Sequence, residues 1–350
     1  MEAASIILYG SYGYTGKLIA ELAAEKGVPL ILSGRNPEKV KAIAAATGHP
    51  HAAVSLDNAT ELDALLSRGK VVLHAAGPFV DTYRAMTAAC LRTQTHYLDI
   101  TGEIEVFEGV AQLDRRAQEK GIMLLPGAGF DVVPTDCMAA LLKARLPDAQ
   151  ELELAFKSGG GVSRGTATTM VRSMGEPNLI RRQGRITPVR PGKREITIDY
   201  GKGPRTAFGI PWGDVSTAYY TTEIPNIATY TVLPPPLGKR LRMSGWMAPL
   251  LRTGWFRRRA QKRIDSRPPG PSAETRRKGR SLIWGRVRNA SGQEEVHHFT
   301  CPEGYSLTAA AALHLAQRAA NGDCKVGFQT PAGCYGAGLL DAVVAEMAPE

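Results

Sequence analysis

Short apolar runs alternate with amphipathic stretches along the first third of the chain. The apolar runs have the composition of buried parallel strands and fall at residues 5–9, 30–33, 52–56, 71–76, 96–100 and 122–125. Between them, apolar residues recur at helical spacing, with Asn36-Pro37 opening one helix and residues 106–119 forming another. Six strand–helix alternations predict a doubly wound, parallel α/β sheet.

The pattern changes after Pro134, where polar and apolar residues alternate as in strands with one face in water. Such strands are expected at residues 151–156, 195–200, 228–232, 281–287 and 295–300, with a helix near residues 166–174. An alanine-rich stretch, residues 307–320, predicts a long helix that Asn321-Gly322 ends. This region indicates a second domain built on a mixed or antiparallel sheet.

With 350 residues, 43% hydrophobic and 22% charged, the chain has the composition of a globular protein of about two domains. Five scattered cysteines without CxxC spacing argue against a metal site or a disulfide framework and favour a reducing, cytoplasmic location. The first strand leaves no room for a signal peptide, and no apolar run reaches the roughly 18 residues of a membrane span.

The net charge of +10 is concentrated in residues 237–286, which hold 15 Lys and Arg against 2 Asp and Glu. Met247, Leu251 and Trp255 recur there at every fourth position, and arginines fall on or near the other side. This pattern favours contact of residues 240–263 with an anionic membrane surface. A cover over a tunnel for an apolar substrate and a solvated basic helix fit the same pattern, whereas no motif supports binding of nucleic acid.

Gly10, Gly13 and Gly16 follow the first strand directly and open the next helix. Glycine is needed where the chain turns tightly and where backbone amides approach a diphosphate. The positive end of the helix dipole favours the same anion. In this strand–turn–helix context the spacing predicts that amides around the three glycines hold a dinucleotide, with an ordinary glycine-rich turn as the alternative.

An arginine, Arg35, stands 19 residues after Gly16, at the end of the second strand. Proteins that bind NAD place an acidic residue at about this distance to hold the ribose 2′-hydroxyl. The Arg35 guanidinium, assisted by the Ser33 hydroxyl, would instead bind the 2′-phosphate of NADP(H). NADP(H) is therefore the expected cofactor, and a solvated arginine at a strand end is the alternative.

The fourth strand ends in small residues that would let the backbone lie close to the nicotinamide ribose, and Phe79 would then wall the ring. A plain strand-to-helix turn begun by Pro78 explains them equally well. The residues expected to contact the cofactor are Gly10, Ser11, Tyr12, Gly13, Tyr14, Thr15, Gly16, Ser33, Arg35, Asn36, Ala76, Gly77 and Pro78.

Reduction also requires a group that protonates or polarises the acceptor. Asp131 and Glu103 follow the carboxyl ends of predicted strands and are the candidate catalytic residues, although capping of the helices that follow explains both. Phe79 and Thr166 are candidate substrate contacts, whereas His74 lies inside a strand and is expected in the core. No tyrosine precedes a lysine by four positions, which excludes the short-chain dehydrogenase mechanism.

The motifs of the first third resemble those of the saccharopine dehydrogenase-like reductases. They are Tyr9-Gly-Ser-Tyr-Gly-Tyr-Thr-Gly16, Ser33-Gly-Arg-Asn-Pro37, Ala76-Gly-Pro-Phe79, Tyr97-Leu-Asp-Ile-Thr-Gly-Glu103, and Gly127-Ala-Gly-Phe-Asp131 with Pro134. Pro211-Trp-Gly-Asp-Val-Ser-Thr217 and Ile224-Pro-Asn-Ile227 are similar to the branch called trans-acting enoyl reductases. The Asp-Pro-Gly triplet of the saccharopine-forming members is here Asp131-Val-Val-Pro134, which argues against an amino-acid substrate.

The resemblance implies a Rossmann domain of residues 1–133 and 302–350, with a returning C-terminal helix, and an inserted substrate domain of residues 134–301. It implies an NADPH-dependent oxidoreductase that transfers hydride to a C=C (enoyl) or C=N bond of a lipid-like or polyketide substrate. A saccharopine-type reductase acting on an amino-acid imine and a non-catalytic NADP(H)-sensing protein are the alternatives. A homodimer is the expected assembly.

Overall fold

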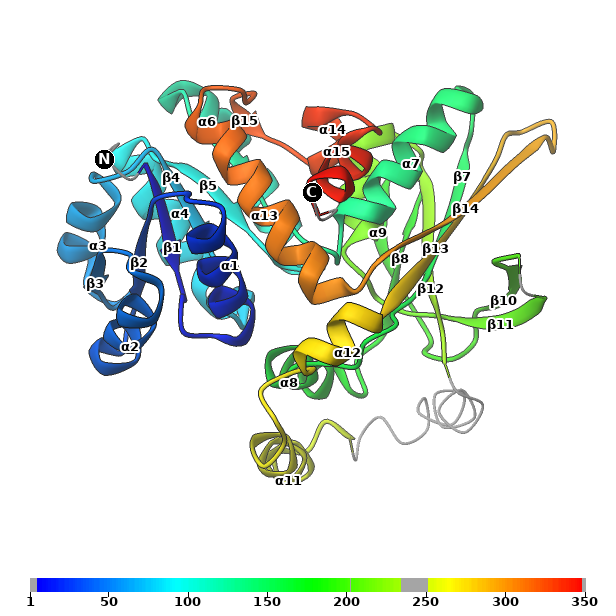
Figure 1. Cartoon of the computed structure of the whole chain (residues 1–350). Helices are drawn as coiled ribbons and strands as arrows, with labels where there is room; N and C mark the ends of the chain where they lie inside the picture. The colour runs from blue at the N-terminus through cyan, green and yellow to red at the C-terminus, as the bar shows by residue number, and fades with distance from the viewer. Residues whose placement is uncertain (1–4, 202, 234–250, 348–350) are drawn as a thin grey trace. The chain divides into compact units, whose positions relative to one another are not determined.

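The chain folds as two units, Met1–Val133 together with Tyr305–Glu350, and Pro134–Gly304. The structure, a computed structural model, describes residues 5–201, 203–233 and 251–347 (Figure 1). The boundaries expected from the sequence follow residues 133 and 301, so the first coincides with that of the units and the second lies three residues earlier.

Seven parallel strands form the sheet of the first unit. They are β1 (Ile6–Tyr9), β2 (Leu30–Gly34), β3 (His51–Ala53), β4 (Val71–His74), β5 (His96–Asp99), β6 (Met123–Leu125) and β15 (Gly327–Phe328). The order across the sheet is β15-β6-β5-β4-β1-β2-β3, which confirms the expected doubly wound arrangement (Figure 1). All residues of β1, β2 and β4 are buried, which explains why their sequences are apolar runs without alternation.

Helices connect these strands and also form most of the C-terminal segment of this unit. They are α1 (Tyr14–Glu25), α2 (Pro37–Thr47), α3 (Ala59–Leu66), α4 (Phe79–Thr93), α5 (Ile104–Ala111), α6 (Asp114–Lys120), α13 (Gly304–Ala320), α14 (Pro331–Tyr335) and α15 (Leu339–Glu346). The predicted cap of α2 is confirmed, because Asn36 Oδ1 accepts the Lys39 amide at 2.9 Å. Among the described residues, no helix combines the length and apolar character needed to cross a bilayer.

The single helix predicted at residues 106–119 is wrong, because the structure has two helices, α5 and α6, in its place. Asp114 is the first residue of α6, and its Oδ1 accepts the backbone amide of Phe328 at 2.7 Å. The break therefore places a carboxylate against the edge strand β15. This contact joins residues distant in the sequence, which helical periodicity does not reveal.

The second unit contains an eight-stranded sheet, as expected of mixed type. Its strands are β7 (Glu151–Lys157), β8 (Asn178–Arg182), β9 (Arg185–Val189), β10 (Glu195–Asp199), β11 (Pro204–Gly209), β12 (Asn226–Val232), β13 (Arg280–Arg288) and β14 (Glu294–Pro302). Its helices are α7 (Val133–Arg145), α8 (Arg164–Ser173), α9 (Asp214–Thr222), α11 (Gly254–Asp265) and α12 (Ala273–Lys278). The main order is β10-β11-β12-β7-β13-β14, in which only β12 and β7 run parallel, and β8 and β9 branch from β12.

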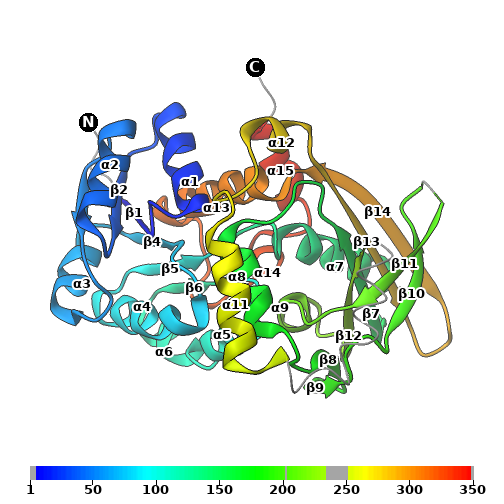
Figure 2. The same ribbon diagram turned by 90° about the horizontal axis from the view of Figure 1, so that it is seen from below.

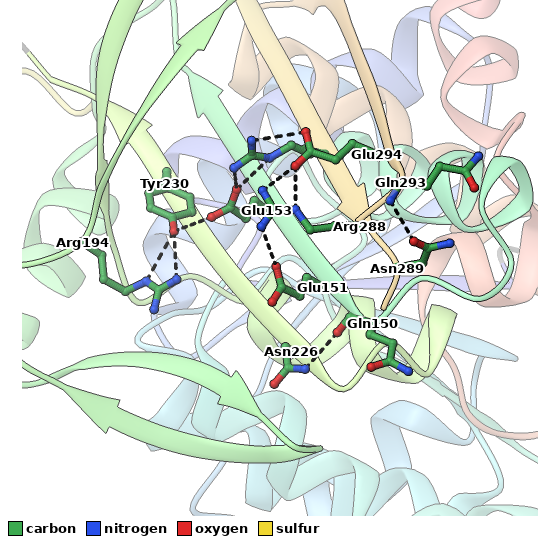
Figure 3. Close-up of polar contacts among 11 residues, drawn as sticks. Gln150, Glu151, Glu153, Arg194, Asn226, Tyr230, Arg288, Asn289, Gln293 and Glu294 are labelled. Atoms are coloured by element: carbon green, nitrogen blue, oxygen red, sulfur yellow. Dashed lines mark hydrogen bonds and ion pairs between the residues drawn. The ribbon is translucent and has the colours of Figure 1, made fainter. Parts of the chain in front are cut away.

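The two faces of this sheet differ in chemistry. On one face α7 packs so closely that a Cβ on Gly285 would lie 2.7 Å from side-chain atoms of Met138 and Leu142. On the other face, ion pairs cross β7, β13 and β14, with Arg286 2.5 Å from Glu153 (Figure 3). Ion pairs that are partly exposed in this way each contribute little to the stability of the fold.

Candidate functional site

The glycine-rich turn lies between β1 and α1, where the chain passes close to the end of β4. Gly10 has φ +87°, and a Cβ there would lie 2.7 Å from the backbone nitrogen of Ala76. A Cβ on Gly16 would lie 2.2 Å from the carbonyl oxygen of Gly10. Both positions therefore require glycine, and the turn is held tightly between β4 and the first turn of α1.

The backbone amides of this turn divide into two groups. The amides of Gly10 and Ser11 donate to the Ser33 carbonyl at 2.8 and 3.1 Å, and the Gly13 amide donates to Gly10 at 3.0 Å. The Gly10 and Gly13 amides are therefore used within the chain, and the diphosphate contact of the amides around Gly10, Gly13 and Gly16 stays a prediction. The first turn of α1, by contrast, has no side-chain cap, so its start is suited to an anionic ligand.

Arg35 is exposed at the end of β2, the strand beside β1. Lys39, in the first turn of α2, places its ammonium 5.7 Å from the centre of the Tyr12 ring. Tyr12 can lie there because Gly34 has no side chain, since a Cβ on Gly34 would lie 2.6 Å from the Tyr12 ring. Two cations and an aromatic ring thus gather where an adenosine 2′-phosphate would bind. Lys39 is not among the residues predicted from the sequence to bind the cofactor. Its position four residues after Arg35, in the first turn of a helix, would have indicated it.

Ser33 has a different role from the one expected. Its side chain is completely buried, so the hydroxyl is not available to a ribose phosphate. Its carbonyl instead accepts the two amides of the glycine turn and the Ser11 hydroxyl, the last at 3.2 Å. Ser33 therefore anchors the turn to β2 through its backbone.

The turn after β4 is fixed by two side chains. The Thr82 hydroxyl donates to the Ala76 carbonyl at 2.9 Å and also contacts Nε2 of His74 at 2.9 Å. His74 is fully buried, as expected, and burial lowers its pKa to about 3, so it stays neutral. The Phe79 ring packs edge-on against His74 at 5.5 Å. Phe79 is thus held partly against the core.

Glu103 caps the helix that follows this turn. Its two carboxylate oxygens accept the amides of Phe79 and Val80 at 3.1 and 3.2 Å, at the N-terminus of α4. The helix directly after it, α5, receives no side-chain cap from Glu103. A cap was the alternative to catalysis for this residue, but the capped helix comes from an earlier part of the chain. Glu103 is accordingly a positioning residue for the Ala76–Phe79 turn.

Asp131 lies beside Glu103 at the ends of β5 and β6. A Cβ on Gly102 would lie 2.9 Å from Asp131 Oδ2, so the carboxyl packs on the backbone next to Glu103. Part of the Asp131 surface is accessible, yet protein atoms surround the carboxyl densely. Burial and, second, the Glu103 charge raise its pKa from 3.8 to about 7. Such a carboxyl can hold and release a proton near neutral pH.

Asp99, the last residue of β5, holds the ends of the strands together. It is completely buried and accepts the Tyr97 hydroxyl at 2.5 Å and the amides of Thr101 and Gly127, both at 2.9 Å. Burial raises its pKa to about 6, although these hydrogen bonds lower it. Because its oxygens are satisfied by the protein, Asp99 supports the strand ends on which Glu103 and Asp131 lie.

These residues fit a pyridine dinucleotide that carries a 2′-phosphate. The uncapped start of α1 can accept the diphosphate, Arg35 and Lys39 the ribose phosphate, and the turn after β4 the nicotinamide end. Comparison with known proteins agrees. Residues 6–125 match the family model of the saccharopine dehydrogenase NADP binding domain.

The first unit carries a saccharopine dehydrogenase NADP-binding domain. The resemblance seen in the sequence motifs is thereby confirmed, and so is NADP(H) as the cofactor of this domain. The matched residues hold β1 to β6, the glycine turn, Arg35 and Glu103.

Similar sequences come from mycobacteria. A trans-acting enoyl reductase of Mycobacterium leprae is 30% identical over 196 residues, which are 50% of this chain and 47% of that protein. A trans-acting enoyl reductase of Mycobacterium tuberculosis is 34% identical over 140 residues, 37% of this chain and 33% of that protein. The chain thus spans about half the length, or less, of these relatives.

Among solved structures, apo saccharopine dehydrogenase (L-Glu forming) from Saccharomyces cerevisiae has a similar fold. The TM-score is 0.62 with 12% sequence identity, covering 98% of this chain and 96% of the other. This likeness concerns the fold alone, and it extends over both units.

Thr166, the second candidate substrate contact, lies outside the NADP-binding domain, in α8 of the second unit. Its amide donates to the Ser163 hydroxyl at 3.2 Å, and the two hydroxyls lie 3.2 Å apart. Ser163 therefore caps α8 with Thr166 as its partner. The role of Thr166 towards a substrate stays a prediction, as do the homodimer and the membrane contact.

Replacing Glu103 by alanine is expected to lower the free energy of unfolding by about 1 kcal/mol, because two amides at the start of α4 lose their acceptors. Urea unfolding of wild type and variant measures the difference. Glu105→Ala is the control, since Glu105 is an exposed acidic residue two positions along α5. Equal losses in the two variants would contradict the capping role.

Proposed function

We propose that this protein uses NADPH to reduce a carbon–carbon double bond conjugated to a thioester, in a lipid-like or polyketide chain. The observation that carries the proposal is an NADP-binding domain with an exposed arginine at the ribose end, in a chain whose sequence relatives are named enoyl reductases. NADPH, when bound, supplies the hydride. Each reduced bond also takes up one proton, and NADP⁺ is released.

Asp131 is the proposed proton donor. Its pKa of about 7 leaves it substantially protonated at neutral pH, whereas an ordinary aspartate would be ionised. Glu103 serves this step indirectly, because its charge helps to keep the Asp131 proton in place and its oxygens fix the turn after β4. Phe79 presents the end of that turn and is the proposed apolar contact for the acceptor.

A screen for NADPH oxidation tests the proposal. Trans-2-enoyl thioesters of increasing chain length are compared with pairs of keto acid and amine, and loss of the reduced nicotinamide absorbance is followed. Oxidation with enoyl thioesters is expected, with NADH much less effective than NADPH. Oxidation only with keto acid and amine would replace the proposal by imine reduction. NADPH binding without turnover of either class would favour the sensing protein.

A further inference from the structure

Two helices of the second unit, α8 and α11, pack against each other and form a separate small apolar cluster (Figure 2). Ala167 and Val171 of α8 contact Ile264 of α11, and all three side chains are buried. Gln261 adds a hydrogen bond of 3.1 Å to Thr168. One side of α11 is thus committed to α8.

Ion pairs fix the beginning of α11. Arg257 lies 2.9 Å from a carboxylate oxygen of Glu176, and Arg252 lies 3.4 Å from the other. Arg252 also donates to the Gly175 carbonyl at 2.9 Å. These two arginines are therefore structural, and the remaining cations of α11 must be explained separately.

The outer side of α11 carries an exposed tryptophan among cations. Trp255 is 62% exposed, the highest value among the large hydrophobic side chains of the described residues. Arg258, Arg259 and Lys262 follow it at three, four and seven positions, so all lie on its side of the helix, and all are exposed. Within the described part of the chain, these three form no ion pair.

This arrangement corrects the pattern expected from the sequence. The sequence predicts an apolar stripe through Met247, Leu251 and Trp255 that faces away from the arginines. Residues 240–250 lie outside the described residues, and Trp255 points to the same side as Arg258 and Arg259. A basic helix that only contacts water does not explain an exposed tryptophan. Tryptophan next to basic residues is instead typical of protein surfaces that bind lipid headgroups.

We infer that Trp255, Arg258, Arg259 and Lys262 form a docking surface for anionic lipid. The cations would contact headgroup phosphates, and the Trp255 ring would enter the boundary between headgroups and acyl chains. Charge complementarity favours an anionic surface, and the ring favours a bilayer over a purely electrostatic partner such as nucleic acid. This contact is independent of the reductase activity, because it needs neither NADPH nor an acceptor.

Vesicle flotation tests the inference on the full chain. Wild type is expected to float with phosphatidylcholine vesicles that contain phosphatidylglycerol, but not with phosphatidylcholine alone. Changing Arg258, Arg259 and Lys262 to glutamate should weaken the binding at least about 100-fold, and Trp255→Ala should weaken it roughly tenfold. Added salt should weaken wild-type binding as well.

The control carries the same change of charge elsewhere. Lys41, Arg68 and Arg116 are exposed cations of the first unit, and their change to glutamate should leave flotation intact. Circular dichroism and thermal unfolding establish that the variants fold. Because the chain has four tryptophans, a blue shift on vesicle addition is assigned to Trp255 only if Trp255→Phe removes it.

Three results would overturn the inference. They are absence of wild-type flotation with phosphatidylglycerol, equal loss in the control variant, and duplex DNA binding that the α11 changes abolish while flotation persists.

Discussion

Replacing Arg35 by aspartate is expected to lower the affinity for NADPH at least about 100-fold and to leave the affinity for NADH equal or higher. The guanidinium is exposed at the end of β2 and would form charge-assisted hydrogen bonds with a 2′-phosphate, each worth about 1.5–3 kcal/mol. A carboxylate there would repel the phosphate and accept hydrogen bonds from the unphosphorylated ribose. The nucleotide preference should therefore invert. Calorimetry with both nucleotides measures it.

Two further variants sharpen this experiment. Lys39→Ala should lower NADPH affinity by a smaller factor, since an ammonium lacks the paired geometry of a guanidinium. Arg68→Asp, which changes an exposed arginine after α3, should have little effect on either nucleotide. Equal wild-type affinities for NADPH and NADH would contradict the assignment of Arg35.

The parallel sheet of the first unit could be predicted from the sequence because each element is indicated by residues within it or next to it. Strands β1, β2 and β4 are buried along their whole length, so apolar composition identifies them. Asn36 and Pro37 mark the start of α2 by their own chemistry, and the structure has that cap. Gly10 and Gly16 indicate close packing of the backbone, which the structure confirms.

Contacts between distant residues could not be predicted in the same way. Glu103 precedes α5 in the sequence, yet its carboxylate caps α4, which starts 24 residues earlier. Ser33 lies at the end of a strand, where the sequence suggests an accessible side chain, but its side chain is buried. Gly10 satisfies its own amide within the chain through that same Ser33. In each case a partner from a distant part of the chain decides the role.

In the second unit the long alternating strands can be recognised from the sequence, whereas the short strands β8, β9 and β11 and the helices α7, α9 and α12 are missed. Helix α7 begins at Val133, so Pro134 lies in its first turn, where proline is tolerated. The sequence shows only that the pattern of polar and apolar residues changes at this point, and it does not indicate a helix. Strands β8 and β9 form a short hairpin that branches from β12, and five residues give little periodic signal.

Replacing Asp131 by asparagine is expected to lower kcat by roughly 10²–10⁴-fold, because the acceptor loses its proton donor. The wild-type kcat should fall as pH rises through about 7, since burial and the Glu103 charge place the Asp131 pKa there and the donor must be protonated. Glu103→Gln should move this decline to lower pH. An unchanged kcat in Asp131→Asn, measured with the acceptor found in the screen, would contradict the role.

The same pKa predicts a stability effect that needs no substrate. Because the Asp131 pKa is about 7 in the folded protein and 3.8 for an aspartate free of the fold, the folded chain binds this proton more tightly than the unfolded chain does. The stabilisation is complete below about pH 4 and is lost as pH rises to about 7. Relative to wild type, Asp131→Asn should therefore gain stability across this window and keep the gain above it. Asp341→Asn, which removes an exposed carboxyl from α15, is the control, and a pH-independent difference for Asp131→Asn would show that its carboxyl titrates normally.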